Sequence, residues 1–250
     1  MVYVEFLRAR RSLAWHAGIL AAITLLILYF GHDTAIDVNG APAVVTGMPV
    51  PLGALAVIAM VFAAIYGSNA GTSLNRENLT RDISWTKPVA RTLVALQFVI
   101  VDIAAIALVF VLTMLAVLAV LARMHIVPVA GATLAPDLVL GLGVGVMWYA
   151  LIQVLTCALG PSGRSISGIL WPVAFVALGL GKVPGVLGAI ARAFDVINPL
   201  AYMGGFSSDS GGVHQQALWV LPVETRALAV WLFAALFCAI AIAVWPRKEA

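Results

Sequence analysis

Long apolar stretches alternate with short polar connections along this chain of 250 residues. The apolar runs are continuous and do not alternate at a period of two, which favours helices over the strands of a barrel. A helix needs about 20 apolar residues to cross the hydrocarbon core of a bilayer. We predict membrane spans over residues 12–30, 50–70, 89–121, 138–159, 166–181 and 226–245.

Two further helices are predicted outside these spans. Before the first span, three apolar residues alternate with three arginines, which favours a short helix lying in the membrane interface, with an ordinary basic flank as the alternative. These residues are Tyr3, Phe6, Leu7, Arg8, Arg10 and Arg11. Before the last span, apolar residues recur at helical spacing at Leu187, Ile190, Phe194 and Ile197. This stripe predicts an amphipathic helix at the outer interface or partly re-entering the bilayer, rather than an exposed connector.

Composition supports a membrane protein. The chain is 63% hydrophobic and only 10% charged, whereas a soluble domain carries about 25% charged residues. It therefore has too little polar surface to cover a water-soluble globule. The expected fold class is an all-α polytopic membrane protein in which residues 1–250 form a single transmembrane domain with six spans.

The distribution of basic residues predicts the orientation, because Lys and Arg are enriched in cytoplasmic connections. If the N-terminus is inside, ten basic residues lie on the cytoplasmic side: Arg8, Arg10, Arg11, Arg76, Arg81, Lys87, Arg91, Arg164, Arg247 and Lys248. Four lie outside: Arg123, Lys182, Arg192 and Arg226. We therefore expect a multi-pass protein of the cell (inner or cytoplasmic) membrane with both termini cytoplasmic. Since the basic residues flank spans, the pI of about 9.1 does not indicate nucleic-acid binding.

Motifs for catalysis or nucleotide binding are missing from the sequence. The phosphate-binding pattern G-x-x-x-x-G-K-[ST] does not occur, and Val183 follows Gly181-Lys182 where a hydroxyl would be required. The four histidines belong to no H-E-x-x-H or paired-cysteine pattern, and no G-x-S-x-G is present. We expect no catalytic residue, metal or cofactor on this chain. If ATP drives it, another chain binds the ATP.

Asp102 interrupts an otherwise apolar span. It follows Arg91 by eleven residues, which places it about 16 Å deeper in a helix and near the middle of the bilayer. An Asp at that depth costs about 2.5–3.5 kcal/mol on insertion scales, so it should face protein or water. One interpretation is a substrate path or proton site that includes Asp102 and Gln153. The other is a structural Asp bonded to Gln153 or Thr156, or lying on a dimer seam.

Small and aromatic residues add packing predictions. Gly141-x-x-x-Gly145, with Gly143, predicts a glycine-rich helix face that another helix approaches closely. Tryptophans near predicted span ends are typical of interface anchors: Trp15, Trp148, Trp171 and Trp231.

The segment 71–91 is the most polar interruption between two spans. Leu79 and Ile83 are four residues apart, with charged residues on the other faces, which favours a short amphipathic helix. Pro88 then stops or kinks the chain. The alternative is a solvated loop whose positive charge only fixes the topology.

Arg76-Glu77, followed by a short helical stretch and then Thr86-Lys87-Pro88-Val89-Ala90-Arg91, resembles the cytoplasmic loop of type-2 ABC transporter permeases. That family commonly has a Glu here, followed by a Pro-Val-Ser-Arg-like step into a long third span. The resemblance extends to the predicted interfacial helix, six spans, inside termini and outer helix, and to the pair Asn198-Pro199.

The resemblance implies a complex with a second permease, identical or related, and with two cytoplasmic ABC ATPase subunits that bind ATP and Mg²⁺. The segment 76–85 would be the coupling helix in an ATPase cleft, with a lesser contact from the loop at Arg164. The implied coupling residues are Arg76, Glu77, Leu79, Arg81, Asp82, Ile83, Trp85 and Arg164. The family mostly exports lipids, peptides, polysaccharides or drugs.

Two other functions remain open from the sequence. One is a secondary transporter or channel driven by an ion gradient, with Asp102 as the ion or proton site. The other is a noncatalytic membrane scaffold that binds a cytoplasmic partner through the same polar segment.

Overall fold

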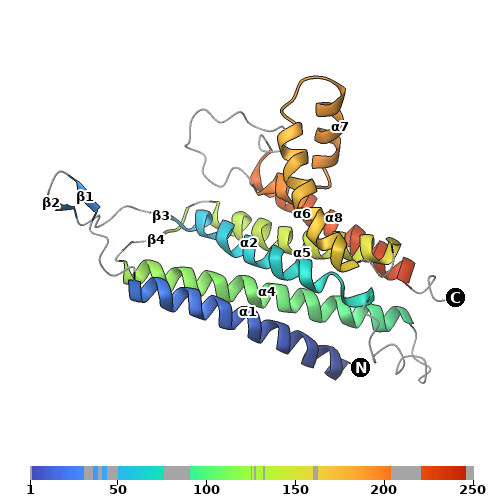
Figure 1. Cartoon of the computed structure of the whole chain (residues 1–250), viewed down its shortest axis with the longest axis horizontal. Coiled ribbons are helices and arrows are strands. Elements are labelled where there is room, and N and C mark those ends of the chain that lie inside the picture. Colours follow the sequence, from blue (N-terminus) through green and yellow to red (C-terminus); the bar gives the residue numbers. More distant parts are fainter. Residues whose placement is uncertain are drawn as a thin grey trace.

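The computed structural model describes residues 2–30, 36–38, 41–43, 50–75, 91–124, 126, 128–131, 133–159, 163–203 and 221–245. These residues fold mainly into helices that pack as a bundle (Figure 1). The helices are α1 (Val2–Phe30), α2 (Leu52–Ala70), η2 (Ser73–Asn75), α4 (Arg91–Arg123), α5 (Leu134–Leu159), α6 (Gly163–Leu180), α7 (Val186–Asp195), η3 (Pro199–Tyr202) and α8 (Val223–Val244).

Short strands form two ribbons that the sequence did not predict. β1 (Ile36–Val38) pairs antiparallel with β2 (Ala41–Ala43). β3 (Val50–Pro51) pairs in parallel with β4 (Pro128–Val129). Both ribbons lie at the end of the bundle opposite to the chain termini (Figure 1). The second ribbon ties the start of α2 to the connection that follows α4.

The six stretches predicted as spans correspond to α1, α2, α4, α5, α6 and α8. Among the described residues, four helices are long and apolar enough to cross a membrane: α1, α4, α5 and α8. The apolar parts of α2 and α6 are shorter, covering Leu55–Ala70 and Gly168–Leu180. The structure is thus consistent with an all-α, multi-pass membrane protein, with four candidate spans of full length.

The N-terminal region differs from the prediction. A separate interfacial helix over the first residues was expected, but α1 runs without a break from Val2 to Phe30. At 1.5 Å per residue this helix is about 43 Å long, which exceeds the hydrocarbon core. The arginines at its start therefore belong to the same continuous helix as the apolar span, and no bend separates them from it.

Helix α5 is the centre of the bundle. Its residues Leu140 and Val144–Ile152 are buried, and α2, α4, α6 and α8 all contact it. Trp148 was predicted as an interface anchor, and that prediction is wrong. Its side chain is fully buried, and its ring centroid lies 4.6 Å from that of Trp171 on α6.

Glycines allow α5 to approach its neighbours closely, as the sequence predicted. A Cβ on Gly145 would lie 2.8 Å from the Ala63 Cβ of α2, and one on Gly141 would lie 3.0 Å from the Phe110 ring of α4. Gly143 does not share that face: a Cβ there would lie 2.9 Å from Trp231 on α8. Because residues two positions apart point to different sides of a helix, the glycines serve two contacts and not one.

Among the described elements, helix α1 has one extensive partner. It packs along α4 and has few contacts with any other element. Trp15, Ile19, Ile23 and Leu26 are exposed along one of its faces. In a membrane this face meets lipid, so the position of α1 depends on α4.

Helices α6 and α7 form a hairpin that projects from one side of the bundle (Figure 1). A helix, α7, occurs where the amphipathic helix was predicted, and its place at the outer interface stays a prediction. Its apolar residues Leu187 and Ile190 are exposed, while Gly188, Ala191 and Asp195 are buried. Asn198 closes the hairpin: its amide donates to Ala174 O at 3.0 Å and to Asp195 Oδ1 at 3.1 Å, and its carbonyl accepts from Leu200 N at 3.1 Å.

We expect Asp195→Asn to be more stable than the wild type at neutral pH. Burial raises the pKa of Asp195, although the Asn198 hydrogen bond opposes that shift. A raised folded-state pKa means that folding favours the protonated acid, so its contribution to stability falls as pH rises through that pKa. Melting temperatures in detergent should differ at about pH 7.5 and converge near about pH 4. A variant that is less stable at neutral pH would contradict this.

Candidate functional site

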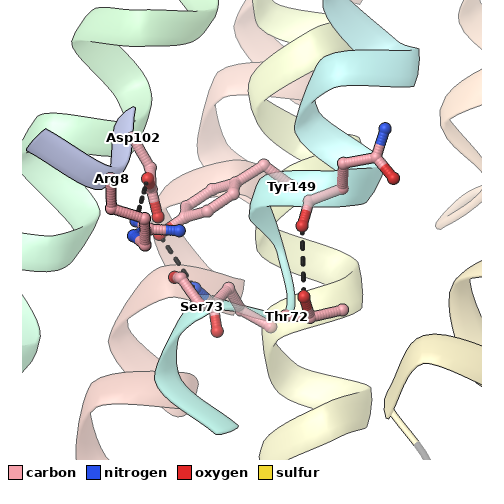
Figure 2. Close-up of polar contacts among 7 residues, drawn as sticks. Arg8, Thr72, Ser73, Asp102 and Tyr149 are labelled. Atoms are coloured by element: carbon pink, nitrogen blue, oxygen red, sulfur yellow. Dashed lines mark hydrogen bonds and ion pairs between the residues drawn. The ribbon is translucent and has the colours of Figure 1, made fainter. Parts of the chain in front are cut away.

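An ion pair joins α1 to α4 inside the bundle. Arg8 Nη2 lies 2.5 Å from Asp102 Oδ1 (Figure 2). The Asp102 side chain is 1% exposed and that of Arg8 is 20% exposed. A carboxylate removed from water in this way needs a cation or several donors beside it. Arg8 therefore supplies the positive charge that makes Asp102 tolerable in the interior.

Phe98 helps to fix the arginine. It precedes Asp102 by four residues and so lies on the same face of α4. The Arg8 guanidinium carbon is 5.7 Å from the centre of the Phe98 ring, within the range of a cation–π contact. One turn of α4 thus offers both a carboxylate and an aromatic face to the same side chain of α1.

The position of Arg8 along α1 also indicates where Asp102 lies in the bundle. Arg8 lies only two residues into the apolar span of α1, Phe6–Tyr29, and Figure 1 shows α4 extending past the N-terminal end of α1. With 33 residues, α4 is about 50 Å long and must project beyond a hydrocarbon core of about 30 Å. The pair consequently lies toward the end of the bundle where α1 and α4 begin. Its depth in a bilayer stays a prediction.

Beside the pair, a hydrogen-bonded cluster links α5 to the residues that follow α2. Gln153 Nε2 donates to Ser73 Oγ at 2.6 Å and to Tyr149 Oη at 2.9 Å. Ser73 and Tyr149 lie next to Asp102 (Figure 2). The two residues predicted for a substrate path, Asp102 and Gln153, therefore belong to neighbouring parts of one polar cluster. Their role in transport stays a prediction.

Two acceptors in this cluster lack a well-aligned donor. Asp102 Oδ2 and Gln153 Oε1 are buried and form no well-aligned hydrogen bond in the described part of the chain, although the Ser73 and Tyr149 hydroxyls lie beside Asp102. A buried oxygen without a donor costs about 1–3 kcal/mol. No group of three or more His, Cys, Asp or Glu residues that could hold a metal ion occurs among the residues described. The cluster can offer oxygens to a proton or a polar group, but it has no metal-ligand set.

The same region holds the chain tightly where it leaves α2. We call residues Gly71–Leu74 the α2 exit. Thr156 Oγ1 lies 3.3 Å from Gly71 O, and Trp245 Nε1 donates to Leu74 O at 2.9 Å. A Cβ on Gly71 would lie 2.8 Å from the Ile152 Cβ. Two helices, α5 and α8, therefore clamp the α2 exit through hydrogen bonds and direct backbone approach.

Only one of the predicted coupling residues lies in the described part of the chain. Arg76, Glu77, Leu79, Arg81, Asp82, Ile83 and Trp85 lie outside the described residues, and Arg164 is in the first turn of α6. The described residues end at Asn75, directly after the α2 exit, and resume at Arg91 with α4.

Sequence reasoning missed the cation that pairs with Asp102. It sought a partner among the spans and assigned Arg8 to a separate interfacial helix. The usable signal was that no Pro or Gly separates Arg8 from the largely apolar run that begins at Leu13, so one helix can include both. Trp245 and Ser73 carried no signal, because their roles depend on which helices become neighbours.

Comparison with known proteins gave no assignment. No protein-family model matches the chain, and neither the curated proteins nor the solved structures gave a match.

We predict that the ion pair behaves as a unit. Arg8→Leu should destabilise the protein by about 3–5 kcal/mol, because it leaves the buried Asp102 carboxylate without its cation. Asp102→Leu should cost less, because the Arg8 side chain is partly exposed. The double variant should lose less than the sum of the two. Unfolding of all four proteins in detergent measures the coupling. Additive losses would show that the two charges do not interact.

Proposed function

We propose that this chain is the transmembrane permease subunit of an ATP-driven exporter of the type-2 ABC class. In this proposal α2 and α6 complete a set of six spans, both termini are cytoplasmic, and the protein lies in the cell membrane. Two cytoplasmic ATPase subunits bind ATP and Mg²⁺, and a second permease completes the complex. The sequence resemblance around segment 76–91 is one support.

The observation that carries the proposal is the clamp on the α2 exit. The ends of α2 and α8 and the starts of α1 and α4 all lie at one end of the bundle (Figure 1). The connection between α2 and α4, which is the most polar part of the chain, therefore starts and returns at that end. A force applied there by a partner reaches α5 and α8 directly, through the bonds to Gly71 and Leu74.

Such a clamp is what coupling requires. ATP can shift the membrane part between two states only if the ATPase contacts differ between those states. If the connection were loosely attached to the bundle, movement of the ATPase would shift the connection alone and leave the spans in place. Because Leu74 and Ser73 are buried and bonded to α8 and α5, movement of the segment would instead displace the bundle core.

The first test is biochemical. We expect the tagged chain to copurify with an ATPase that has no membrane spans. Glu77→Lys or Arg81→Glu should uncouple ATP hydrolysis from transport without preventing insertion. Arg123→Glu is a matched control, because that exposed arginine lies at the opposite end of α4. If disruption of all of segment 76–85 left coupling unchanged, the proposal would fail.

The second test addresses the clamp. We predict that Trp245→Phe weakens coupling in the assembled complex, because it removes the indole donor to Leu74 O and leaves a buried carbonyl unpaired, at a cost of about 1–3 kcal/mol. Trp231→Phe is the matched control. It removes an indole-to-carbonyl bond of similar length, to Val139 O at 3.1 Å, at an exposed position in the first half of α8 and away from the α2 exit. Equal effects of the two variants on the ratio of transport to ATP hydrolysis would contradict a specific role for the α2 exit.

One observation favours a second candidate, a transporter driven by an ion gradient. Asp102 Oδ2 is buried without a well-aligned hydrogen bond in the described residues and could accept a proton. This function requires proton flux through the purified chain in liposomes without ATP, and loss of that flux in Asp102→Asn but not in Asp137→Asn. No flux from the folded chain would exclude it. A scaffold would instead bind its partner and move nothing.

A further inference from the structure

A cleft opens between α1 and α2 at the end of the bundle that carries the termini. Both helices pack on α4 but have few contacts with each other. The space between them has a volume of about 610 Å³, within the range of about 300–1,000 Å³ that ligand sites occupy. Arg8, Arg11, Ser12 and Trp15 of α1 and Tyr66 and Asn69 of α2 line it.

The cleft closes in the direction of the bilayer centre. The His16 and Tyr66 rings meet edge to face, with their centroids 4.9 Å apart, and so join α1 to α2. On the α1 side the lining begins at Leu7, next to the start of the apolar span Phe6–Tyr29, and on the α2 side it ends with the apolar stretch Leu55–Ala70. If Phe6–Tyr29 spans the bilayer, the cleft lies at the depth of lipid headgroups in the leaflet on the side of the N-terminus.

Among the described residues, the charged side chains that line this cleft are positive. Arg8 and Arg11 contribute two cations, and Asp102 neutralises the first from behind. Arg11 is exposed and has no carboxylate within salt-bridge distance among the described residues. Ser12 and Asn69 add a hydroxyl and an amide that can donate hydrogen bonds. Arginine with neutral donors is the side-chain set that recognises a phosphate.

An apolar path leads away from the cleft along the same helix. Trp15, at its edge, is followed at intervals of four residues by Ile19 and Ile23, and all three are exposed. Residues at this spacing lie on one face. A ligand with a phosphate at the arginines can therefore lay a hydrocarbon chain along α1. A soluble phosphate would leave that path unused.

We propose that this cleft binds the headgroup of an anionic phospholipid, with the phosphate on Arg11 and the acyl chain along Trp15 and Ile19. The net positive charge favours an anionic over a zwitterionic headgroup. Since α1 has only α4 as an extensive partner, the lipid would fill the gap on the side of α2 and stabilise the pose of α1. This site does not depend on coupling to ATP.

The test is lipid retention by the full-length protein in native mass spectrometry. Phosphatidylglycerol or phosphatidylcholine is added to the protein in detergent, and the lipid-bound fraction is measured. We expect phosphatidylglycerol to be retained in preference. Arg11→Gln should lower its affinity about tenfold, the loss expected for a charge-assisted hydrogen bond. Since Arg11 is exposed, the variant keeps its fold.

Arg10→Gln is the matched control, because Arg10 is the neighbouring exposed arginine on the same helix and does not line the cleft. Its affinity should stay within about twofold of the wild type, since no specific phosphate bond is lost. Equal losses in the two variants would show diffuse attraction by surface charge and overturn the proposal. So would equal retention of both lipids, or displacement of phosphatidylglycerol by inorganic phosphate at the same concentration.

Discussion

Helices α2 and α5 meet backbone to backbone. A Cβ on Gly67 would lie 2.6 Å from Gly145 O, and one on Gly71 would lie 2.9 Å from Tyr149 O. In lipid no hydrophobic force drives apolar helices together, so close packing and hydrogen bonds must hold them. The glycines of α2 and α5 provide that packing. They also fix the position of α2 along the axis of α5, which brings Ser73 next to Gln153. The polar cluster therefore depends on the α2–α5 contact.

The ion pair extends this arrangement to α1. Because α1 packs extensively on α4 alone, its exposed side contributes little to its position, and lipid could replace any apolar contact there without loss. A charge pair cannot be replaced in that way, since either partner alone in the interior is costly. Asp102 thus determines where along α4 the helix α1 comes to rest. That placement leaves a gap between α1 and α2, whose wall includes the same arginine.

Hydropathy was sufficient to predict most of the helices, because spans are defined by length and continuous apolarity within single segments. The stripe at Leu187 and Ile190 likewise identified α7, and Gly141 and Gly145 identified a close helix contact. Pairing between segments was not predictable. Nothing local distinguishes Trp148, which is buried, from Trp15, which is exposed. The Arg8–Asp102 pair was missed for the same reason, since a basic residue near a span end usually reports topology.

These features gather at one end of the bundle. Four features lie where α2 ends and where α1 and α4 begin: the ion pair, the Gln153 cluster, the α2 exit and the cleft proposed to bind a lipid phosphate. The opposite end has short strand pairs and the connection to α5. Polar interactions inside lipid are costly, so a chain that concentrates them in one place is stiff there and more uniform elsewhere. If the α2–α4 connection is the coupling segment, as proposed, stiffness at that end would let its movement displace α5 and α8 together. Helix α1 is held at the same end by its ion pair with α4.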